Sequence, residues 1–357
     1  MKNLLIISRP QFGYLVDLYK WCKYIDSDYN IDVVTFGSRP KVSLDRDNLR
    51  VHYVSDKGNR LVRGLRFIII SVWYILKNKG SIIIEYFIGC NVFKILVPYK
   101  KMVLDIRTLS VSDKREIREK DDRILKGYTE IFDYISIVSD SARIKLGLDY
   151  SKTFVVPLGA DIISVTNKNY DNLNLLYVGT LTNRRIDKTI HGLKLFIERN
   201  PNVSIHYDIV GDGHGAELKE LSNLIDMLGV GDFVTLHGYK RHHEIKYLYD
   251  SNNIGVSFVP ITDYYNSQPP TKTYEYILSG LYTIATGTDC NKEIVTFNSG
   301  IIINDSDSDF CSALEYIHLN KTELDSNKVR ETLIDYQWEK IVNRYLHAML
   351  DTIDKNS

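Results

Sequence analysis

Short apolar runs rich in isoleucine and valine recur along this chain of 357 residues, separated by longer amphipathic stretches. Continuous apolar runs are typical of parallel strands buried on both faces, and the stretches between them have helical spacing. The alternation therefore predicts an α/β fold with parallel sheets. The expected strands are residues 4–8, 31–36, 51–54, 82–86, 102–106, 135–138 and 154–156, then 175–178, 204–210, 233–236, 254–258, 282–285 and 300–303.

The alternation of strands and helices is interrupted once, by the polar stretch SVTNKNYDNLN at residues 164–174. We interpret this stretch as a linker. At about 150 residues per domain, the length also fits two domains. We therefore expect a doubly wound domain in residues 1–163 and a second one in 164–336, followed by a terminal helix in 337–357. Such sheets bind ligands at the carboxyl ends of their strands, so a cleft between the two domains is the expected place for chemistry.

Composition narrows the class of protein. The chain is 44% hydrophobic and 25% charged, as in an ordinary globular protein. Its four cysteines are widely spaced and form no Cys-x-x-Cys pair, which favours a reduced compartment such as the cytoplasm. The longest apolar run, FIIISVWYIL at 67–76, has ten residues where a membrane span needs about twenty. The N-terminal apolar run is too short for a signal peptide.

The net charge of zero conceals two oppositely charged halves. Residues 1–160 contain 27 Lys and Arg against 18 Asp and Glu, whereas the remaining residues contain 18 against 27. Basic residues also flank the apolar run 67–76, as expected either for a core helix or for a helix that contacts anionic lipid at the inner face of a membrane. These residues are Arg60, Arg63 and Arg66 before the run, and Lys77 and Lys79 after it.

The segment SQPPTKTYEYILSG at 267–280 is the most informative motif. Pro269 and Pro270 fix the start of a helix, and Lys272 lies in its first turn beside Thr271. A cation at a helix N-terminus opposes the helix dipole, so Lys272 predicts a bound anion. Glu275, one turn later, is placed to accept hydrogen bonds from a ribose diol. A solvated first turn without a ligand is the structural alternative.

A second strand, turn and helix start lies at residues 176–188, with Arg184, Arg185 and Lys188 at the beginning of the helix. Three cations at this end of a helix are locally unfavourable, and a diphosphate would compensate them. In a doubly wound domain this turn opens onto the same sheet edge as the segment 267–280, so both could bind one ligand.

Two further motifs have structural explanations. Gly211, Gly213 and Ala216 fit a dinucleotide fingerprint in which glycines approach phosphate, but no acidic residue ends the next expected strand. A tight strand-to-helix turn near the cleft is therefore favoured over nicotinamide binding, and Gly211 in this turn is an expected donor-binding residue. The run 305–309 (DSDSD) could be an Asp-x-Asp metal site, but it immediately precedes an amphipathic pattern and is better explained as a helix cap.

The order of three segments resembles the C-terminal nucleotide-sugar domain of retaining GT-B glycosyltransferases of the glycosyltransferase group 1 family. The resemblance covers roughly residues 174–300, and it implies two Rossmann-like domains that face a cleft. It also implies that the last helix, opened by YQWEKI, crosses back to an N-terminal domain that binds the acceptor. The segments are LLYVGTLTNRRIDKTI at 175–190, the stretch from YDIVGDG to SFVP at 207–260, and PPTKTYEYILSGLYTIATGT at 269–288.

The resemblance also implies roles for individual residues. The family has two glutamates separated by seven residues; Glu275 matches the second, which contacts ribose, but Ser267 occupies the first, which is associated with the donor sugar. Asp263 and Gln268 are the candidates to replace that first glutamate. The family's arginine after the first glycine is Thr180 here, so the phosphate role passes to Arg185. Tyr239 follows the strand whose end meets the base, and Gly13, in QFGY, resembles the glycine of the loop beneath the donor phosphates.

Asp105 and Arg107 follow an expected strand of the first half, where related enzymes carry a catalytic histidine or acid. Their predicted role is to orient the acceptor hydroxyl or to stabilise charge, with a buried structural salt bridge as the alternative.

The resemblance thus predicts a glycosyltransferase that moves a sugar from a nucleotide diphosphate sugar to a hydroxyl acceptor with retention, in cell-surface polysaccharide or glycolipid synthesis. It needs no metal and no cofactor besides this donor, and nucleic acid is not an expected partner. A nucleotide-sugar epimerase and a non-catalytic nucleotide-sugar-binding subunit remain alternatives, the second because Ser267 and Thr180 depart from the family pattern.

Overall fold

The computed structural model describes residues 1–213 and 215–355, which form two compact units. Unit 1 comprises Met1–Gly159 and Trp338–Ser357, and unit 2 comprises Ala160–Gln337. The division thus lies between residues 159 and 160 and between 337 and 338, where the sequence had suggested 163/164 and 336/337. None of the helices in the described residues is long and apolar enough to cross a membrane.

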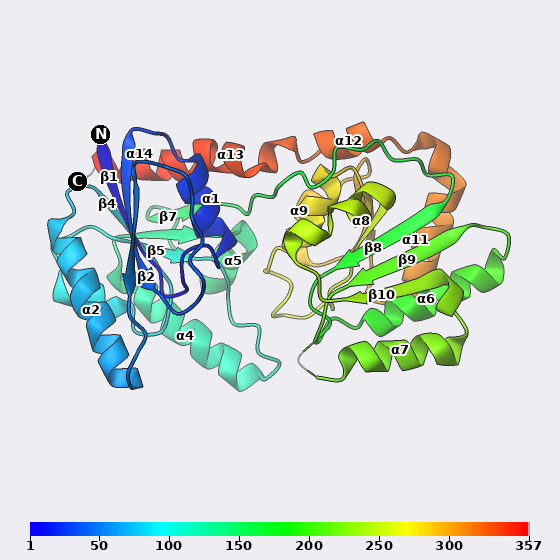
Figure 1. The fold of residues 1–357 in the computed structure, drawn as a ribbon, viewed down its shortest axis with the longest axis horizontal. Coiled ribbons are helices and arrows are strands. Elements are labelled where there is room, and N and C mark those ends of the chain that lie inside the picture. Colours follow the sequence, from blue (N-terminus) through cyan, green and yellow to red (C-terminus); the bar gives the residue numbers. More distant parts are fainter. Residues whose placement is uncertain (214, 356–357) are drawn as a thin grey trace. The chain divides into compact units, whose positions relative to one another are not determined.

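Unit 1 contains a parallel sheet of seven strands in the order β3-β2-β1-β4-β5-β6-β7 (Figure 1). The strand order reverses at β1, which pairs with β2 on one side and β4 on the other. This doubly wound order places the strand ends around β1 and β4 at a switch point, where such sheets bind ligands. The strands are β1 (Lys2–Ile7), β2 (Tyr29–Phe36), β3 (Leu49–Val54), β4 (Ser81–Glu85), β5 (Val103–Ile106), β6 (Tyr134–Ile137) and β7 (Thr153–Val155).

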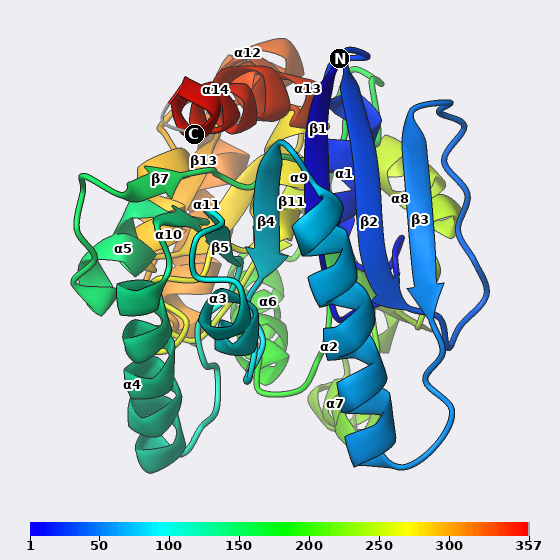
Figure 2. The same cartoon turned by 90° about the vertical axis from the view of Figure 1, so that its left-hand side faces the viewer.

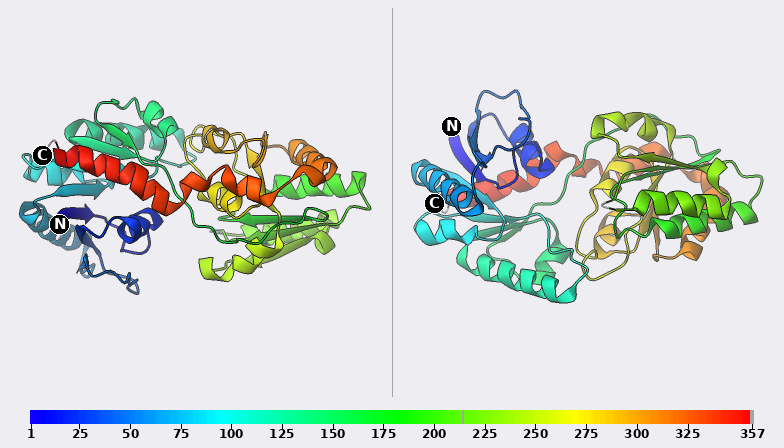
Figure 3. Two further views of the ribbon diagram at one scale, coloured as in Figure 1. Left: turned by 90° about the horizontal axis from the view of Figure 1, so that it is seen from above. Right: turned by 60° about the horizontal axis from the view of Figure 1, so that its bottom comes forward.

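Helices cover both faces of this sheet, with α2 in front of the strands and α1 behind them in Figure 2. The long helix α2 packs against β1, β2 and β3 through Phe67, Ser71 and Ile75. The C-terminal helices belong to this unit as well, since α13 and a π-helical turn at Val342–Leu346 pack on α1 (Figure 3). The helices are α1 (Val16–Tyr24), α2 (Arg60–Lys77), α3 (Asn91–Leu96), α4 (Arg115–Ile131), α5 (Asp140–Leu146), α13 (Trp338–Ile341) and α14 (His347–Lys355).

Unit 2 repeats the doubly wound design with six parallel strands in the order β10-β9-β8-β11-β12-β13. Here the order reverses at β8, whose neighbours are β9 and β11. The strands are β8 (Leu173–Val178), β9 (Ile205–Val210), β10 (Val234–Gly238), β11 (Ile254–Ser257), β12 (Tyr282–Thr286) and β13 (Gly300–Ile303).

The helices of unit 2 begin where the sequence signals predict. Pro270 precedes the first residue of α9, and the Ser306 hydroxyl caps α11 by accepting a hydrogen bond from the Asp309 amide. The cap confirms the structural explanation of the run 305–309. The helices are α6 (Ile186–Arg199), α7 (Glu217–Leu228), α8 (Lys246–Ser251), α9 (Thr271–Leu278), α10 (Asp289–Ile294), α11 (Asp307–Asn320) and α12 (Ser326–Glu331).

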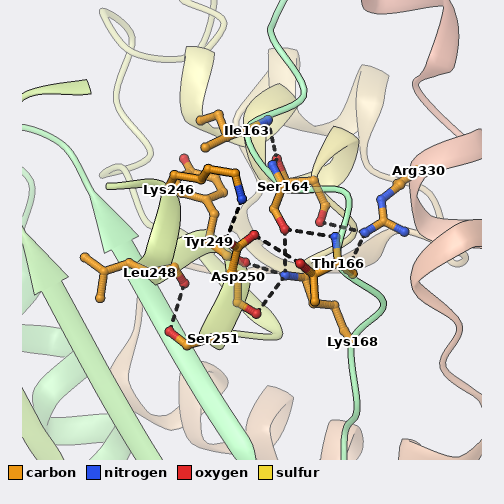
Figure 4. A network of polar contacts seen from close by, with 11 residues as sticks. Ile163, Ser164, Thr166, Lys168, Lys246, Leu248, Tyr249, Asp250, Ser251 and Arg330 are labelled. Carbon is orange, nitrogen blue, oxygen red and sulfur yellow. Dashed lines mark hydrogen bonds and ion pairs between the residues drawn. The ribbon is translucent and has the colours of Figure 1, made fainter. Parts of the chain in front are cut away.

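The segment expected to be a linker is attached to unit 2 by a polar network (Figure 4). The Lys168 ammonium donates hydrogen bonds to the Tyr249 carbonyl oxygen and, at 3.2 Å, to the Ser164 hydroxyl. Arg330 of α12 donates to the Thr166 carbonyl oxygen at 2.5 Å. Burial lowers the pKa of Lys168 to about 8. This stretch therefore forms part of the folded surface of unit 2.

Candidate functional site

Three glycines bring the backbone turns after β8, β9 and β10 together at the carboxyl ends of these neighbouring strands of unit 2. The Gly211 amide donates to the Gly238 carbonyl oxygen at 2.9 Å, and a Cβ added to Gly211 would lie 1.8 Å from the Gly179 carbonyl oxygen. Gly211 also has φ of +149°. Its lack of a side chain is therefore explained by contact between two turns, as expected of a tight turn, and the donor contact assigned to Gly211 stays a prediction.

Lys272 and Arg184 lie together beside Gly179. The Lys272 ammonium is 3.8 Å from the centre of the Tyr177 ring, and the Arg184 guanidinium is 4.3 Å from the centre of the Tyr265 ring. A Cβ on Gly179 would lie 3.6 Å from Lys272 Nζ. In residues 1–213 and 215–355, no carboxylate forms an ion pair with either cation. The structure thus places Arg184 from one motif and Lys272 from the other near each other, and both motifs were expected to bind an anion.

The pKa of Lys272 shows how unfavourable its charge is without a partner. Burial lowers this pKa well below the usual value of 10.5, and the positive charge of Arg184 lowers it further. Cation–π contact with Tyr177 offsets only part of that cost. A bound anion would reverse the effect, because an opposite charge within hydrogen-bonding distance favours the ammonium form.

The side chains of Arg185 and Lys188 contact other partners. Arg185, in the left-handed conformation at the start of α6, forms an ion pair with Asp187 at 3.1 Å. The Lys188 ammonium donates to the carbonyl oxygen of Asp305. Within the described residues, Arg184 is therefore the cation of this cluster that lies near Lys272.

Glu275 occupies the next turn of α9 and shares a helix face with Lys272. The Tyr249 hydroxyl donates to the Glu275 carboxylate at 3.4 Å, and burial together with that carboxylate raises the pKa of Tyr249 well above 10.0. Thr271, the first residue of α9, is exposed. The ribose role of Glu275 stays a prediction, with the carboxylate held by a buried phenol.

Tyr239 and Gln268 lie on loops next to these turns. Tyr239 follows Gly238, whose φ is +65°, and its side chain is 73% exposed. The backbone amide of Gln268 donates to the Tyr265 carbonyl oxygen at 3.1 Å, within the turn that precedes Pro270. Ser267 is buried. The base and donor-sugar roles assigned to Tyr239 and Gln268 remain predictions.

The two proposed catalytic residues lie in a buried ion network of unit 1. Arg107 donates to Asp17 at 2.7 Å and to the Val156 carbonyl oxygen at 2.9 Å, and its Nη1 lies 3.6 Å from Asp105 Oδ1. Burial raises the pKa of Asp105 to about 6, although the charge of Arg107 opposes this shift. The geometry is that of the salt-bridge alternative, and a role with the acceptor stays a prediction.

Gly13 has φ of +89°, and a Cβ there would lie 2.4 Å from Val42 Cβ. Gln11 fixes the same loop, since its side-chain amide donates to the Arg39 carbonyl oxygen and its Oε1 accepts from the Arg39 amide. The loop after β1 is thereby anchored to the loop after β2. This packing accounts for Gly13, and a phosphate contact there stays a prediction.

Sequence reasoning missed Glu85, which ends β4 at the switch point of unit 1. Its carboxylate accepts a hydrogen bond from the Ser8 hydroxyl at 2.5 Å, and burial raises its pKa to about 7. The signal was present as an acid that ends the apolar strand SIIIE.

Residues 172–320 match the family described as glycosyl transferases group 1. This stretch resembles a glycosyltransferase group 1 domain. The match runs from the start of β8 to the end of α11 and includes Gly179, Arg184, Lys272 and Glu275.

Solved structures extend the likeness from residues 172–320 to the whole chain. Sucrose-phosphate synthase from Thermosynechococcus elongatus has a TM-score of 0.77 at 16% identity, with 100% of both chains covered. Anabaena HepE in complex with UDP and glucose has a TM-score of 0.76 at 14% identity, covering 99% of this chain and 100% of that one. The lipopolysaccharide outer core galactosyltransferase WaaB has 0.72 at 14%, covering 98% and 100%.

At such identities the likeness establishes the fold. The predicted fold class, two Rossmann-like domains of the GT-B type, is confirmed. No curated protein matches the chain.

Proposed function

We propose that this protein transfers a sugar, with retention of anomeric configuration, from a nucleotide diphosphate sugar to a hydroxyl acceptor of a cell-surface polysaccharide or glycolipid. The resemblance to a glycosyltransferase group 1 domain supports the transfer class. Two similar structures, those of HepE and TarM, contain UDP, which supports a nucleotide donor. Retention rests on the resemblance of the sequence to the retaining family.

The observation that carries the proposal is the unpaired cluster of Lys272 and Arg184. Two cations stand at the C-terminal edge of the sheet in the part of unit 2 that the structure describes, beside a glycine and near the N-terminus of α9. A diphosphate would supply the negative charge that this cluster lacks. Glu275, one turn further along α9, would then accept hydrogen bonds from the ribose hydroxyls.

The same cluster suggests how the leaving group is stabilised. Breaking the bond between sugar and phosphate develops negative charge on the departing nucleoside diphosphate. Fixed cations and helix N-termini stabilise such charge without a metal ion, because they are oriented before the reaction begins. We therefore propose that Lys272 and Arg184 perform this role, and that transfer persists when divalent ions are chelated.

Binding of nucleotides tests the assignment directly. We would measure thermal stabilisation by UDP, GDP, ADP and CDP, because a ligand of the folded state raises the melting temperature. One nucleotide should stabilise the wild type but not the Arg184→Met variant. The matched control is Lys194→Met, which removes a cation from α6 that forms an ion pair with Glu198. If no nucleotide stabilises the wild type, or if Arg184→Met retains the response, the proposal fails.

We also propose that unit 1 contacts an anionic membrane surface. The outer face of α2 exposes large apolar side chains, while only Phe67, Ser71 and Ile75 of that helix are buried. The predicted apolar run 67–76 is thus divided between core and surface. Exposed basic residues lie at both ends of α2, as expected for a helix that lies on anionic lipid. The exposed apolar residues are Leu61, Val62, Leu65, Ile69, Trp73 and Leu76.

A further inference from the structure

Unit 1 contains a cavity of about 720 Å³ to which no role has yet been assigned. It lies where β1, β2 and β4 end, and the first half of α2 forms one wall. This volume is in the range of sites that bind small molecules, and the position is the switch point of a doubly wound sheet.

Four arginines from three separate segments line this cavity. Arg9 follows β1, Arg39 follows β2, and Arg60 and Arg63 lie in the first turns of α2. Within the described residues, none of their guanidinium groups donates a hydrogen bond or forms an ion pair. The only acids in the lining are Asp56 and Glu85. The cavity therefore has an excess of positive charge and unused donors.

Several other arginines of unit 1 are held by hydrogen bonds or ion pairs. Arg46 donates to the carbonyl oxygens of Cys22 and Ile25 at 2.8 Å and 2.7 Å, and Arg107 is fixed by Asp17. Arg66, three residues beyond Arg63, donates to two backbone carbonyl oxygens. Among the described residues, four guanidinium groups that have no hydrogen bond or ion pair thus line one cavity, as expected of a site that awaits an anionic ligand.

The cavity also has an aromatic wall. The Phe36 and Phe67 rings stack with centres 4.6 Å apart, and Phe87 packs on Phe67 at 6.0 Å. The Arg9 guanidinium lies 5.7 Å from the centre of the Phe87 ring, and that of Arg39 lies 4.8 Å from the centre of the Tyr14 ring. Stacked in this way, a guanidinium keeps its planar donor edge available for a phosphate oxygen.

We propose that this cavity binds the acceptor by a phosphoryl group, held by Arg9, Arg39, Arg60 and Arg63, with the rest of the acceptor against the Phe36–Phe67 wall. Phosphoryl is favoured over a single carboxylate because four guanidinium groups match the charge and the several oxygens of a phosphate or diphosphate. Identifying the bound molecule as the acceptor rests on the proposed function. The binding of a phosphoryl group in this cavity does not depend on it.

The first test measures binding of two probes, glucose 1-phosphate and geranyl diphosphate, by isothermal titration calorimetry. The titrations use the Lys272→Met variant, so that the cluster in unit 2 does not contribute. The double substitution Arg60→Gln with Arg63→Gln, on the exposed first turns of α2, should weaken probe binding about tenfold or more. The control is Arg50→Gln, an exposed arginine of β3 outside the cavity, which should leave affinity unchanged.

The outcomes separate this inference from the donor assignment. Tighter binding of geranyl diphosphate supports a lipid-linked acceptor, and tighter binding of glucose 1-phosphate supports a soluble one. If neither probe binds, or if the double substitution has no effect, the inference is overturned even when the wild type binds nucleotide. In a transfer assay, the double substitution should raise the KM for a phosphorylated acceptor and leave the KM for the donor unchanged. An equal rise in both values would overturn the inference.

Discussion

Lys272 and Glu85 are ionisable residues whose uncharged forms are favoured by burial. The Lys272 pKa lies well below 10.5, and the pKa of Glu85 is raised to about 7. Each side chain costs stability in its charged form, and each lies at the switch point of its sheet. Groups of this kind are retained where a ligand restores the charge or uses the proton.

Replacing Lys272 with methionine should therefore separate stability from binding. The folded protein binds the lysine proton less tightly than the unfolded chain does, so the charge destabilises most at neutral pH and least near pH 10.5. Lys272→Met should raise the free energy of unfolding at pH 7 by on the order of 1 kcal/mol and abolish stabilisation by nucleotide. Urea denaturation with and without nucleotide measures both effects. A variant that is less stable than the wild type at pH 7 would contradict this account.

Glu85→Gln should show the opposite dependence on pH. The folded-state pKa of Glu85, about 7, exceeds its ordinary value of 4.5, so its favourable contribution is complete below pH 4.5 and is lost as pH rises through 7. The variant should match the wild type near pH 5 and exceed its free energy of unfolding at pH 8 by on the order of 2 kcal/mol. Glu116→Gln, on the exposed surface of α4, is the control for a lost carboxylate. A difference that does not change with pH would refute the explanation.

The site could be predicted from sequence only in part. The anomalous position of Lys272 at a helix start was visible, because capping and dipole rules act on neighbours along the chain. The sequence favoured Arg185 over Arg184 and Lys188 for the phosphate role. It could not show their partners Asp187, Tyr265 and Asp305, because rotamers and tertiary packing set these contacts. Glu85 was missed because its burial depends on Ser8, 77 residues away.

At the scale of elements, the turns after β8 and β9 act as one unit because their backbones touch. The φ of Gly211 and the 1.8 Å approach to the Gly179 carbonyl oxygen exclude any side chain there. A shift of either turn would move α6 and α7, which begin just beyond them.

Gly211→Ala should destabilise the protein by more than about 2 kcal/mol, because the added Cβ collides with backbone and cannot be accommodated by a rotamer change. The matched control is Gly127→Ala in the interior of α4, where an added Cβ meets nothing within 4 Å. That substitution should stabilise by about 0.5–1 kcal/mol, through the higher helix propensity of alanine. Equal effects of the two substitutions on urea denaturation would show that the contact between the turns is unimportant.

The outer face of α2 gives a prediction about lipid. Leu65→Gln combined with Ile69→Gln removes side chains that are 59% and 66% exposed, so stability should change little while vesicle binding falls several-fold. Co-sedimentation with phosphatidylglycerol vesicles measures this, and phosphatidylcholine vesicles should bind weakly. Met227→Gln with Leu319→Gln, exposed positions of unit 2, form the control pair. Unchanged binding of the α2 variant would exclude this face as the contact.

Strands were easier to predict than helix surfaces. All thirteen expected strands occur, because buried parallel strands are apolar on both faces and leave an unbroken signal in the sequence. The run 67–76 was ambiguous for the converse reason. A helix that is apolar on both its core side and its outer side has no polar face to mark which residues are buried, so only the structure separates Ile75 from Ile69.

At the scale of the whole molecule, the two units differ in how the chain builds them. Unit 2 is one continuous segment with its own sheet, whereas unit 1 combines the first 159 residues with the segment from Trp338 onward. Trp338 fills the space beside Gly159, where an added Cβ would lie 2.7 Å from its ring. Unit 1 is therefore incomplete without the C-terminal helices.

A fragment of residues 160–337 should fold and bind nucleotide, because it contains the complete sheet of unit 2 and the Lys272–Arg184 cluster. A fragment of residues 1–159 should lack a cooperative unfolding transition, since it lacks the helices that pack on α1 and β4. Circular dichroism during urea titration compares the two fragments. If fragment 1–159 unfolded as cooperatively as the intact chain, the C-terminal helices would be dispensable.

The return of the chain to unit 1 has a consequence for its synthesis on the ribosome. Unit 2 can fold as soon as its last residue leaves the exit tunnel, but unit 1 must wait for residues that are translated after unit 2. During that interval the surfaces of α1 and β4 that later pack against α13, the π-helical turn and α14 stay open. Unit 1, whose synthesis starts before that of unit 2, is thus completed after it, and it is the unit that a chaperone would need to protect.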